Sequence, residues 1–158
     1  MPTQIESIYG NKVRTRVCGL CVVQHKLLLV NHTGLTEGDF WAPPGGGINF
    51  GESASDAIER EFLEEVNITI RCGSLLFVSE YIKAPLHAIE LFFLVDYSEG
   101  QLKSGIDPEM NSKDQIIKGS QFMTWSEVAK LNKNELHGVF KYVSEPSKIL
   151  DLRGYFKV

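Results

Sequence analysis

The chain has 158 residues, of which 43% are hydrophobic and 23% charged, a size and composition typical of one soluble globular domain. Its formal net charge of -4 at pH 7 argues against a protein that coats nucleic acid, because phosphate binding favours a basic surface. No apolar run approaches the roughly 20 residues that cross a bilayer, and the N-terminal residues lack the basic and apolar segments of a signal peptide.

Two strands joined by a short turn are predicted first. Residues 13–23 and 27–30 have strand character, and the polar residues between them favour a hairpin. Residues 31–40 are polar and contain glycine, which predicts a loop. The prolines and glycines of residues 41–47, WAPPGGG, predict a segment without regular structure.

The first predicted strand contains a C-x-x-C sequence, Cys18 to Cys21. Such a pair can form a redox centre or half of a zinc site. Residues three apart in a regular strand point to opposite faces, however, and no second C-x-x-C or histidine pair completes a zinc site. We therefore expect both to be buried strand residues. With only Cys72 besides, no disulfide framework is expected, which favours a reducing, cytoplasmic location.

A helix is predicted to follow. Ser53 is a suitable N-cap, and Asp56 stands at the spacing of a capping box. The helix should end near Asn67, because Asn tolerates the left-handed conformation of a C-terminal cap. Apolar residues recur with helical spacing at Ala54, Ile58, Phe62 and Val66, and Leu63 falls with the last three on one broad apolar arc.

The remaining elements are strands and then helices. Strands are predicted at residues 68–70, 75–82 and 87–97. Residues 98–115 form a long polar loop, a kind of segment that often carries function or disorder. Three further elements are predicted after it: a strand at 122–125, a helix at 126–131 with Ser126 as its N-cap, and a last helix at 133–145. This order predicts a layered α/β fold without a domain boundary.

Three carboxylates share one side of the predicted helix. Spacings of three and four residues group Glu61, Glu64 and Glu65. Carboxylates this close destabilise one another unless a cation lies among them, and hard divalent ions prefer oxygen ligands. On the helix alone a solvated charged surface is the simpler interpretation, so the neighbouring residues have to decide between the two.

Those neighbours are suited to a cation site. Arg60 is four residues before Glu64 and can pair with it. Glu52 stands at the helix entrance, where a negative charge interacts favourably with the helix dipole. The glycines at 45–47 allow the backbone to approach a bound group, so that a backbone carbonyl can join the carboxylates.

The spacing resembles the Nudix box, G-x5-E-x7-R-E-U-x-E-E-x-G-U, in which U is apolar. The chain fills this pattern with Gly46, Glu52, Arg60, Glu61, Phe62, Glu64, Glu65 and Ile68. Asn67 stands where the family has glycine, and we expect the helix end to survive because Asn is the commonest other residue in a left-handed cap. WAPPGGG also resembles the tryptophan–proline–glycine lead-in of many Nudix proteins.

The resemblance implies the Nudix αβα sandwich with a mixed β-sheet, as a single domain over residues 1–158 with a core at about 13–142. It also implies a MutT-like pyrophosphohydrolase that uses Mg²⁺ or Mn²⁺. The bond hydrolysed would be the pyrophosphate of a nucleoside diphosphate linked to another moiety. The expected partner is therefore a small-molecule nucleotide, with neither a membrane nor nucleic acid expected, and a homodimer is compatible with the sequence.

Roles for the metal-binding residues follow from the resemblance. Glu64 and Glu65 would bind the metal, and Glu61 would be a third ligand or the group that activates water. The carbonyl of Gly45 would complete the metal shell.

Other roles concern support and the general base. Arg60 would orient Glu61, while Gly46 and Glu52 would maintain the loop–helix geometry. Family members often supply a further acid from a distal loop, and the long loop here offers, in our order of preference, Asp114, then Glu109, with Asp107 also present.

The substrate is less well defined by the sequence. Neither Tyr81 nor Pro85 stands at a spacing that identifies a substrate group. Several strand residues either line a substrate groove or lie at exposed positions: Arg14, Arg16, Glu80, His87 and Glu90. We expect a nucleotide sugar or ADP-ribose. The alternatives are a nucleoside triphosphate removed in house-cleaning, a Nudix-fold regulator that binds nucleotides without turnover, and an enzyme acting on nucleic-acid 5′ ends, which the acidic charge disfavours.

Overall fold

The structure is a computed structural model that describes residues 3–32, 38–103 and 117–158. Its main helices are α1 (Gln4–Tyr9), α2 (Ala54–Val66) and α3 (Trp125–Lys130), followed by the 3-10 turns η1 (Lys133–Glu135), η2 (Gly138–Tyr142) and η3 (Pro146–Asp151). The strands are β1 (Lys12–Val23), β2 (Lys26–His32), β3 (Phe40–Ala42), β4 (Gly45–Gly47), β5 (Ile68–Lys83), β6 (Leu86–Gly100), β7 (Ile117–Thr124) and β8 (Gly154–Lys157).

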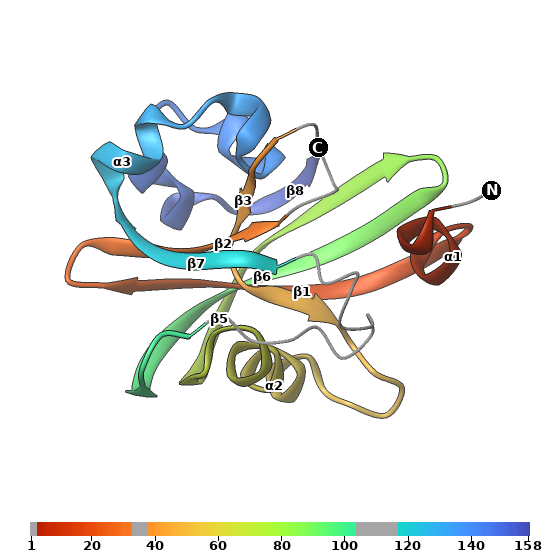
Figure 1. Cartoon of the computed structure of the whole chain (residues 1–158), viewed down its shortest axis with the longest axis horizontal. Helices are drawn as coiled ribbons and strands as arrows, with labels where there is room; N and C mark the ends of the chain where they lie inside the picture. Colours follow the sequence, from red (N-terminus) through yellow and green to blue (C-terminus); the bar gives the residue numbers. More distant parts are fainter. Residues whose placement is uncertain (1–2, 33–37, 104–116) are drawn as a thin grey trace.

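The strands form one mixed sheet. Its main order is β3-β2-β1-β6-β5-β8, with β4 paired to β1 and β7 paired to β2. The pairs β1–β6 and β5–β8 are parallel, whereas the other pairs are antiparallel. Helix α2 lies against one face, and α3 with the 3-10 turns lies against the other (Figure 1). The predicted αβα sandwich in a single α/β domain is therefore confirmed.

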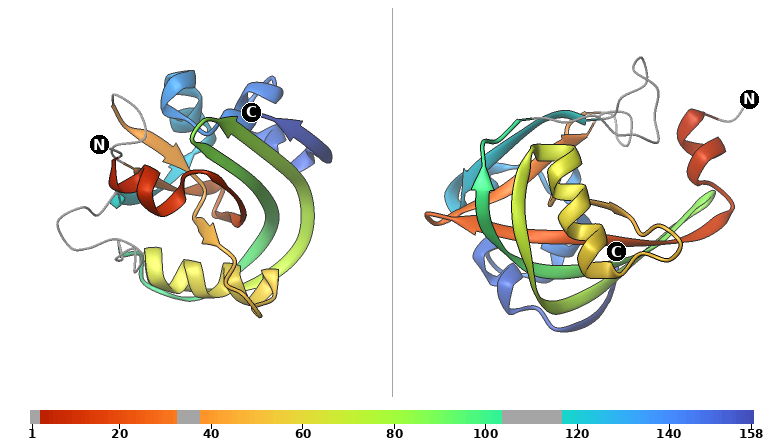
Figure 2. Two further views of the ribbon diagram at one scale, coloured as in Figure 1. Left: turned by 90° about the vertical axis from the view of Figure 1, so that its right-hand side faces the viewer. Right: turned by 90° about the horizontal axis from the view of Figure 1, so that it is seen from below.

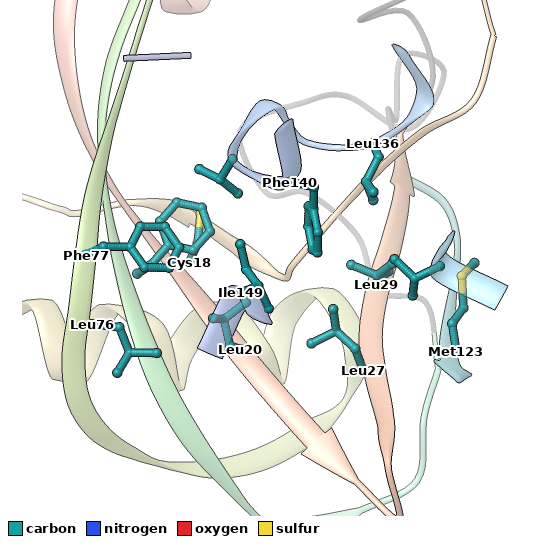
Figure 3. Packing of buried hydrophobic residues seen from close by; sticks show 13 residues of the cluster. Cys18, Leu20, Leu27, Leu29, Leu76, Phe77, Met123, Leu136, Phe140 and Ile149 are labelled. Carbon is teal, nitrogen blue, oxygen red and sulfur yellow. The ribbon is translucent and has the colours of Figure 1, made fainter. Parts of the chain in front are cut away.

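Each face of the sheet has its own hydrophobic core. On one face, Leu20 and Phe77 pack with Phe140 from the C-terminal turns (Figure 3). On the other, Val17 packs with Phe62 from α2. The alternation of side chains along a strand explains the two cores.

The cysteines of the C-x-x-C sequence follow the same alternation. Cys18 belongs to the core beneath the C-terminal turns, and Cys21 belongs to the core beneath α2. Both are buried and free. The prediction that they are buried strand residues is confirmed.

The predicted ends of α2 are confirmed. The side chain of Ser53 accepts a hydrogen bond from the Asp56 N–H, and Asn67 has φ 58° and ψ 35°. On the predicted apolar arc, Ile58, Phe62 and Val66 are buried. Leu63, on the same arc, is 56% exposed.

Several boundary predictions are also wrong. WAPPGGG contains strand residues, because its backbone pairs with neighbouring strands: β3 with β2, and β4 with β1. The strands predicted at 68–70 and 75–82 are one irregular strand, β5. Residues 98–100 extend β6, and 104–116 lie outside the described residues.

The C-terminal predictions need similar correction. The N-cap of α3 is Thr124 rather than Ser126, and Thr124 forms a capping box with Glu127. The helix predicted at 133–145 is replaced by η1 and η2. Helix α1, η3 and β8 were not predicted. No helix in the described segments is long and apolar enough to cross a bilayer.

The two ends of the described chain lie beside the long β5–β6 hairpin. The N–H of Asn11, just after α1, donates to the Pro85 carbonyl in the hairpin turn over 2.7 Å. At the other end β8 adds to β5, and the N–H of Val158 donates to the Glu80 carbonyl. Figure 2 shows β5 and β6 curving between α2 and the C-terminal turns. Side chains of this hairpin, among them Tyr81 and His87, line the cavity of the site described next.

Candidate active site

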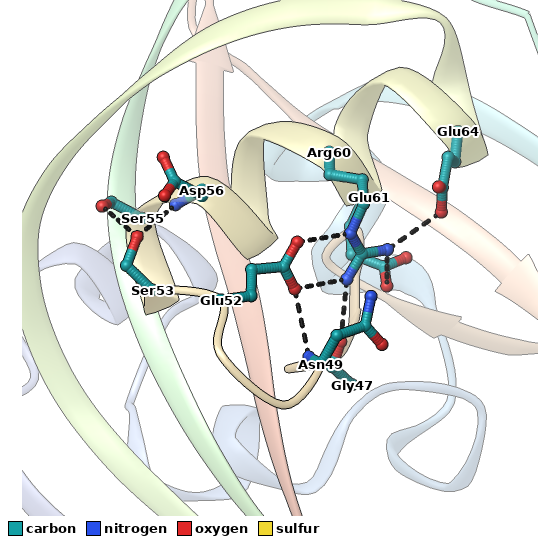
Figure 4. A network of polar contacts seen from close by, with 9 residues as sticks. All are labelled: Gly47, Asn49, Glu52, Ser53, Ser55, Asp56, Arg60, Glu61 and Glu64. Carbon is teal, nitrogen blue, oxygen red and sulfur yellow. Dashed lines mark hydrogen bonds and ion pairs between the residues drawn. The ribbon is translucent and has the colours of Figure 1, made fainter.

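Arg60 is the centre of a polar network on α2 (Figure 4). Its Nε and Nη2 donate to the two oxygens of Glu52 over 2.7 and 2.9 Å. Nη1 donates to Glu61 over 2.9 Å and to Glu64 over 3.0 Å. Nη2 also reaches the Gly47 carbonyl at 3.0 Å. The guanidinium thus connects the loop before α2 and strand β4 to two predicted ligands. The sequence predicted only that Arg60 orients Glu61.

Glu65 contacts β4 from the same helix. It is 8% exposed, and the Gly45 N–H donates to its Oε2 over 3.1 Å. The preceding residue, Pro44, accepts a hydrogen bond from Gly19 of β1. Because backbone groups alternate along an antiparallel ladder, the N–H and carbonyl of Gly45 are directed away from β1. The Gly45 carbonyl therefore lies on the edge of β4 that Glu65 contacts.

The three predicted ligands Glu61, Glu64 and Glu65 are here called the acidic face. Arg60 pairs with Glu61 and Glu64, and Glu52 takes two further hydrogen bonds from the same guanidinium. Only 12% of the Glu61 side chain is exposed. Burial raises the pKa of Glu61 above its ordinary value, although hydrogen bonds and charge from Arg60 oppose this.

The donor atoms of the acidic face suit a hard divalent cation, but the three carboxylates do not converge on one position. It offers carboxylate oxygens beside a backbone carbonyl, which are the donors that Mg²⁺ prefers. Among the residues that the structure describes, no group of three His, Cys, Asp or Glu side chains converges closely enough to hold a metal. The reason is that Arg60 holds Glu61 and Glu64 while Glu65 accepts from Gly45. Metal binding would require these side chains to turn, and it stays a proposal.

A cavity of about 540 Å³ is lined by the acidic face and by side chains of β1 and β6. The strand residues Arg14, Arg16 and His87, which the sequence left between groove and surface, all line it. The guanidinium of Arg14 also lies over the Tyr9 ring, 3.9 Å from its centroid. These positions favour the groove over a purely exposed role for all three residues.

Glu90 turns inward, whereas Glu80 does not. Glu90 is 3% exposed and accepts from Arg16 Nη1 over 2.7 Å. Its other oxygen is 2.7 Å from His137 Nε2. Glu80 instead contacts His87 at 2.7 Å and the Tyr155 hydroxyl. The question that the sequence left open therefore has a different answer for each carboxylate.

Two histidines in this cavity were missed from the sequence. His32 is 8% exposed and His137 is 7% exposed, and both line the cavity. Neither stands in a recognisable motif, and only the fold brings His137 to Glu90. The distal acids Asp114, Glu109 and Asp107 lie outside the described residues.

Comparison with known proteins agrees with this geometry. The profile of the NUDIX domain matches residues 11–142. A segment of 93 residues, 58% of this chain, is 33% identical to an ADP-ribose pyrophosphatase of Methanocaldococcus jannaschii, and it spans 55% of that relative. The chain thus spans about half the length of this curated relative.

Solved structures share the fold. A MutT protein from Methanosarcina mazei Go1 superposes with a TM-score of 0.66 at 18% identity, over 84% of this chain and 90% of that one. A MutT NUDIX hydrolase from Burkholderia pseudomallei gives 0.63 at 20% identity, over 78% and 93%. Together with the match over most of the chain, the fold and the filled box show that the protein belongs to the NUDIX family.

Proposed function

We propose that this protein hydrolyses the pyrophosphate bond of a nucleoside diphosphate linked to another moiety, with ADP-ribose or a nucleotide sugar as substrate. The observation that carries the proposal is the network in which Arg60 joins Glu52, Glu61 and Glu64 to β4. A solvated charged surface would not hold these side chains against a strand edge beside a 540 Å³ cavity. The similarity to an ADP-ribose pyrophosphatase supports the substrate class.

Mg²⁺ or Mn²⁺ would be held by Glu61, Glu64, Glu65 and the Gly45 carbonyl. When bound there, the metal supplies neutralisation of the pyrophosphate charge and lowers the pKa of a coordinated water. The feature that supports such a cation is the set of oxygen donors, three carboxylates on one side of α2 beside the Gly45 carbonyl.

The protein's own residues position the reaction. Arg60 donates to both Glu61 and Glu64 and keeps their carboxylates beside the cavity, from where they would turn to the metal. Glu61 is the candidate general base where it activates water instead of binding the metal, because it lines the cavity and burial raises its pKa. Glu52 keeps the Arg60 guanidinium in place through two hydrogen bonds. Asp114 or Glu109 in the long loop remains our proposal for a further acid.

Two alternatives are carried with this proposal. The second candidate substrate is a nucleoside triphosphate. The third hypothesis is a regulator that binds nucleotides without turnover. Against it stands the complete set of box residues Arg60, Glu61, Glu64 and Glu65. Cytoplasmic location and a homodimer stay predictions.

A substrate panel tests the proposal. The protein is incubated with ADP-ribose, nucleotide sugars, dinucleoside polyphosphates and nucleoside triphosphates, with Mg²⁺ and then with excess EDTA. We expect nucleoside monophosphate from ADP-ribose or a nucleotide sugar, abolished by EDTA. Turnover of triphosphates alone would favour the second candidate, and no turnover of any member would favour the regulator.

A further inference from the structure

Glu90 is a buried carboxylate surrounded by hydrogen-bond donors. The Val139 N–H donates to His137 Nδ1 over 3.2 Å, so Nε2 carries the ring proton and donates to Glu90. Ser79 and Cys18 donate to the same carboxylate. Burial alone would raise the pKa of Glu90, yet its pKa is held well below its ordinary value because His137, Arg16 and Cys18 stabilise the ionised form. Glu90 is therefore a fixed negative charge at the floor of the cavity.

Arg16 uses only part of its hydrogen-bonding capacity on this charge. In the segments that the structure describes, Nη1 donates to Glu90 and the buried Nε has no partner. The side chain remains 27% exposed and lines the cavity. A guanidinium held on one side by a carboxylate can present its other donors to a second oxyanion.

The position of Arg16 suits an anion that also reaches the acidic face. Arg16 stands opposite Gly47 in the β1–β4 pairing and beside Glu90 in the β1–β6 pairing. Burial would lower the pKa of Arg16, but Glu90 and then Glu65 and Glu61 raise it. The acidic face is thus close enough for its charge to be felt, and one cavity contains both.

His32 adds a second buried polar group to the lining of the cavity. It is 8% exposed, and its buried Nδ1 has no partner among the described residues. Burial, and then Arg16, lower its pKa to about 4, so His32 is neutral at pH 7. Buried polar groups are normally hydrogen-bonded. Within the described part of the chain Arg16 Nε lacks a partner, and the exposed part of the same guanidinium lines the cavity beside His32, where a polar ligand can reach it.

We propose that Arg16 binds a phosphoryl oxygen of the substrate's diphosphate across the cavity from the acidic face, and that Glu90 and His137 are positioning residues that fix its guanidinium. This inference rests on the proposed function and extends it beyond the box. The ligand chemistry is a diphosphate, because it has oxyanions for both the guanidinium and a cation on the acidic face. Residues of β1, β6 and η2 thereby form a second half of the site.

Binding of methylenediphosphonate tests the role of Arg16 without requiring turnover. This diphosphate has a bridging carbon that hydrolysis cannot break, and its affinity is measured by calorimetry in Mg²⁺. We expect Arg16→Gln and Arg16→Lys each to weaken binding by about tenfold or more. Arg16→Lys keeps a positive charge beside Glu90 and therefore protects the fold if Arg16→Gln does not fold. Arg71→Gln, an exposed β5 position outside the cavity, is the matched control and should bind normally.

Substitutions at His137 test the positioning role. His137→Leu removes the donor to Glu90 and should weaken binding, whereas His137→Gln keeps a donor and should restore part of it. Val139→Ala, in the same turn and core, matches the loss of stability without touching Glu90. Equal weakening in Val139→Ala and His137→Leu would overturn the positioning role.

Two outcomes would overturn the role of Arg16. One is wild-type affinity in Arg16→Lys, and the other is no diphosphonate binding by the wild type. A failed substrate panel with diphosphonate binding that still depends on Arg16 would count against the hydrolase proposal alone.

Discussion

The carboxylate of Glu61 lies directly against Gly46. A methyl group added at Gly46 would stand 2.3 Å from Glu61 Cδ, whereas one added at Gly45 would stand 2.0 Å from the Val17 carbonyl oxygen. Gly46 is thus beside the movable end of a side chain, and Gly45 is beside backbone. Gly46 is therefore required by the active site, whereas its neighbour Gly45 is required by the packing of β4 on β1.

Gly46→Ala should fold but hydrolyse poorly. The Glu61 carboxylate can turn away from the new methyl group at small cost, but it is then misplaced, and we expect the rate to fall by about tenfold to a hundredfold. Gly45→Ala should instead lower the melting temperature sharply, because β4 must separate from β1. Circular dichroism melts and ADP-ribose hydrolysis measure both effects. If the Gly46→Ala protein is fully active, the position of the Glu61 carboxylate does not matter for hydrolysis, and its proposed role is wrong.

Arg60→Lys should lose both stability and activity. A lysine ammonium cannot reproduce the fork that spans Glu52, Glu61, Glu64 and the Gly47 carbonyl. We expect a loss of about 1–2 kcal/mol in the free energy of unfolding, since the network is partly exposed, and a fall in kcat of about tenfold or more. Urea unfolding and steady-state rates provide the measurements. Rates within twofold of wild type would show that the fork does not position the carboxylates.

His32 predicts a loss of stability on acidification. Its pKa is lowered from 6.5 to about 4, mainly by burial, so below pH 6.5 the unfolded chain binds a proton that the folded chain does not. Its contribution is therefore complete above pH 6.5 and is lost as the pH falls towards 4. The expected slope is about 1.4 kcal/mol per pH unit within this window.

The matched variant for that measurement is His32→Gln. Its free energy of unfolding, measured with urea at several pH values, should fall less steeply than that of the wild type over the same window. Parallel pH profiles for the two proteins would mean that His32 is not buried in its neutral form.

Asn67, the one departure from the box, should affect stability and not catalysis. Its φ of 58° is left-handed, and its Nδ2 donates to the Gln101 carbonyl over 3.0 Å. Asn67→Ala should cost about 1–2 kcal/mol, because alanine is strained there and lacks the hydrogen bond. Asn67→Gly should change stability by less than about 1 kcal/mol, since relief of strain offsets the lost bond and the greater freedom of the unfolded chain. Hydrolysis rates for both variants should stay close to that of the wild type. A large loss of rate in either would contradict the claim that Asn67 does not affect the positions of the acidic-face carboxylates.

The α2 half of the site could be predicted because it depends on local spacing. A helix places Glu61, Glu64 and Glu65 together whatever the rest of the chain does, and Ser53 and Asn67 mark its ends by their own conformational preferences. The exposure of Leu63 was not predictable in this way, because burial depends on which parts of the helix the rest of the fold covers.

The other half of the site depends on long-range pairing. Arg16 and Glu90 meet through the β1–β6 register, and His137 arrives from a 3-10 turn that was predicted as part of a longer helix. A methyl group at Gly138 would stand 2.9 Å from Val158 Cβ, so the packing of this turn is settled by residues far along the chain. The glycines at 45–47 were predicted to lack regular structure from their composition. They form strand β4 because their backbone pairs with β1.

The central claim is that the acidic face holds a divalent cation that drives pyrophosphate hydrolysis. Its most direct test is the Mg²⁺-dependent rate of AMP formation from ADP-ribose in the wild type, in Glu64→Gln and in Glu59→Gln. Glu59 is on the same helix but is exposed and accepts from the Cys72 N–H, so it controls for removing one carboxylate from α2. We predict a loss of about a hundredfold or more in Glu64→Gln and a near wild-type rate in Glu59→Gln. Equal rates in all three proteins would contradict the claim.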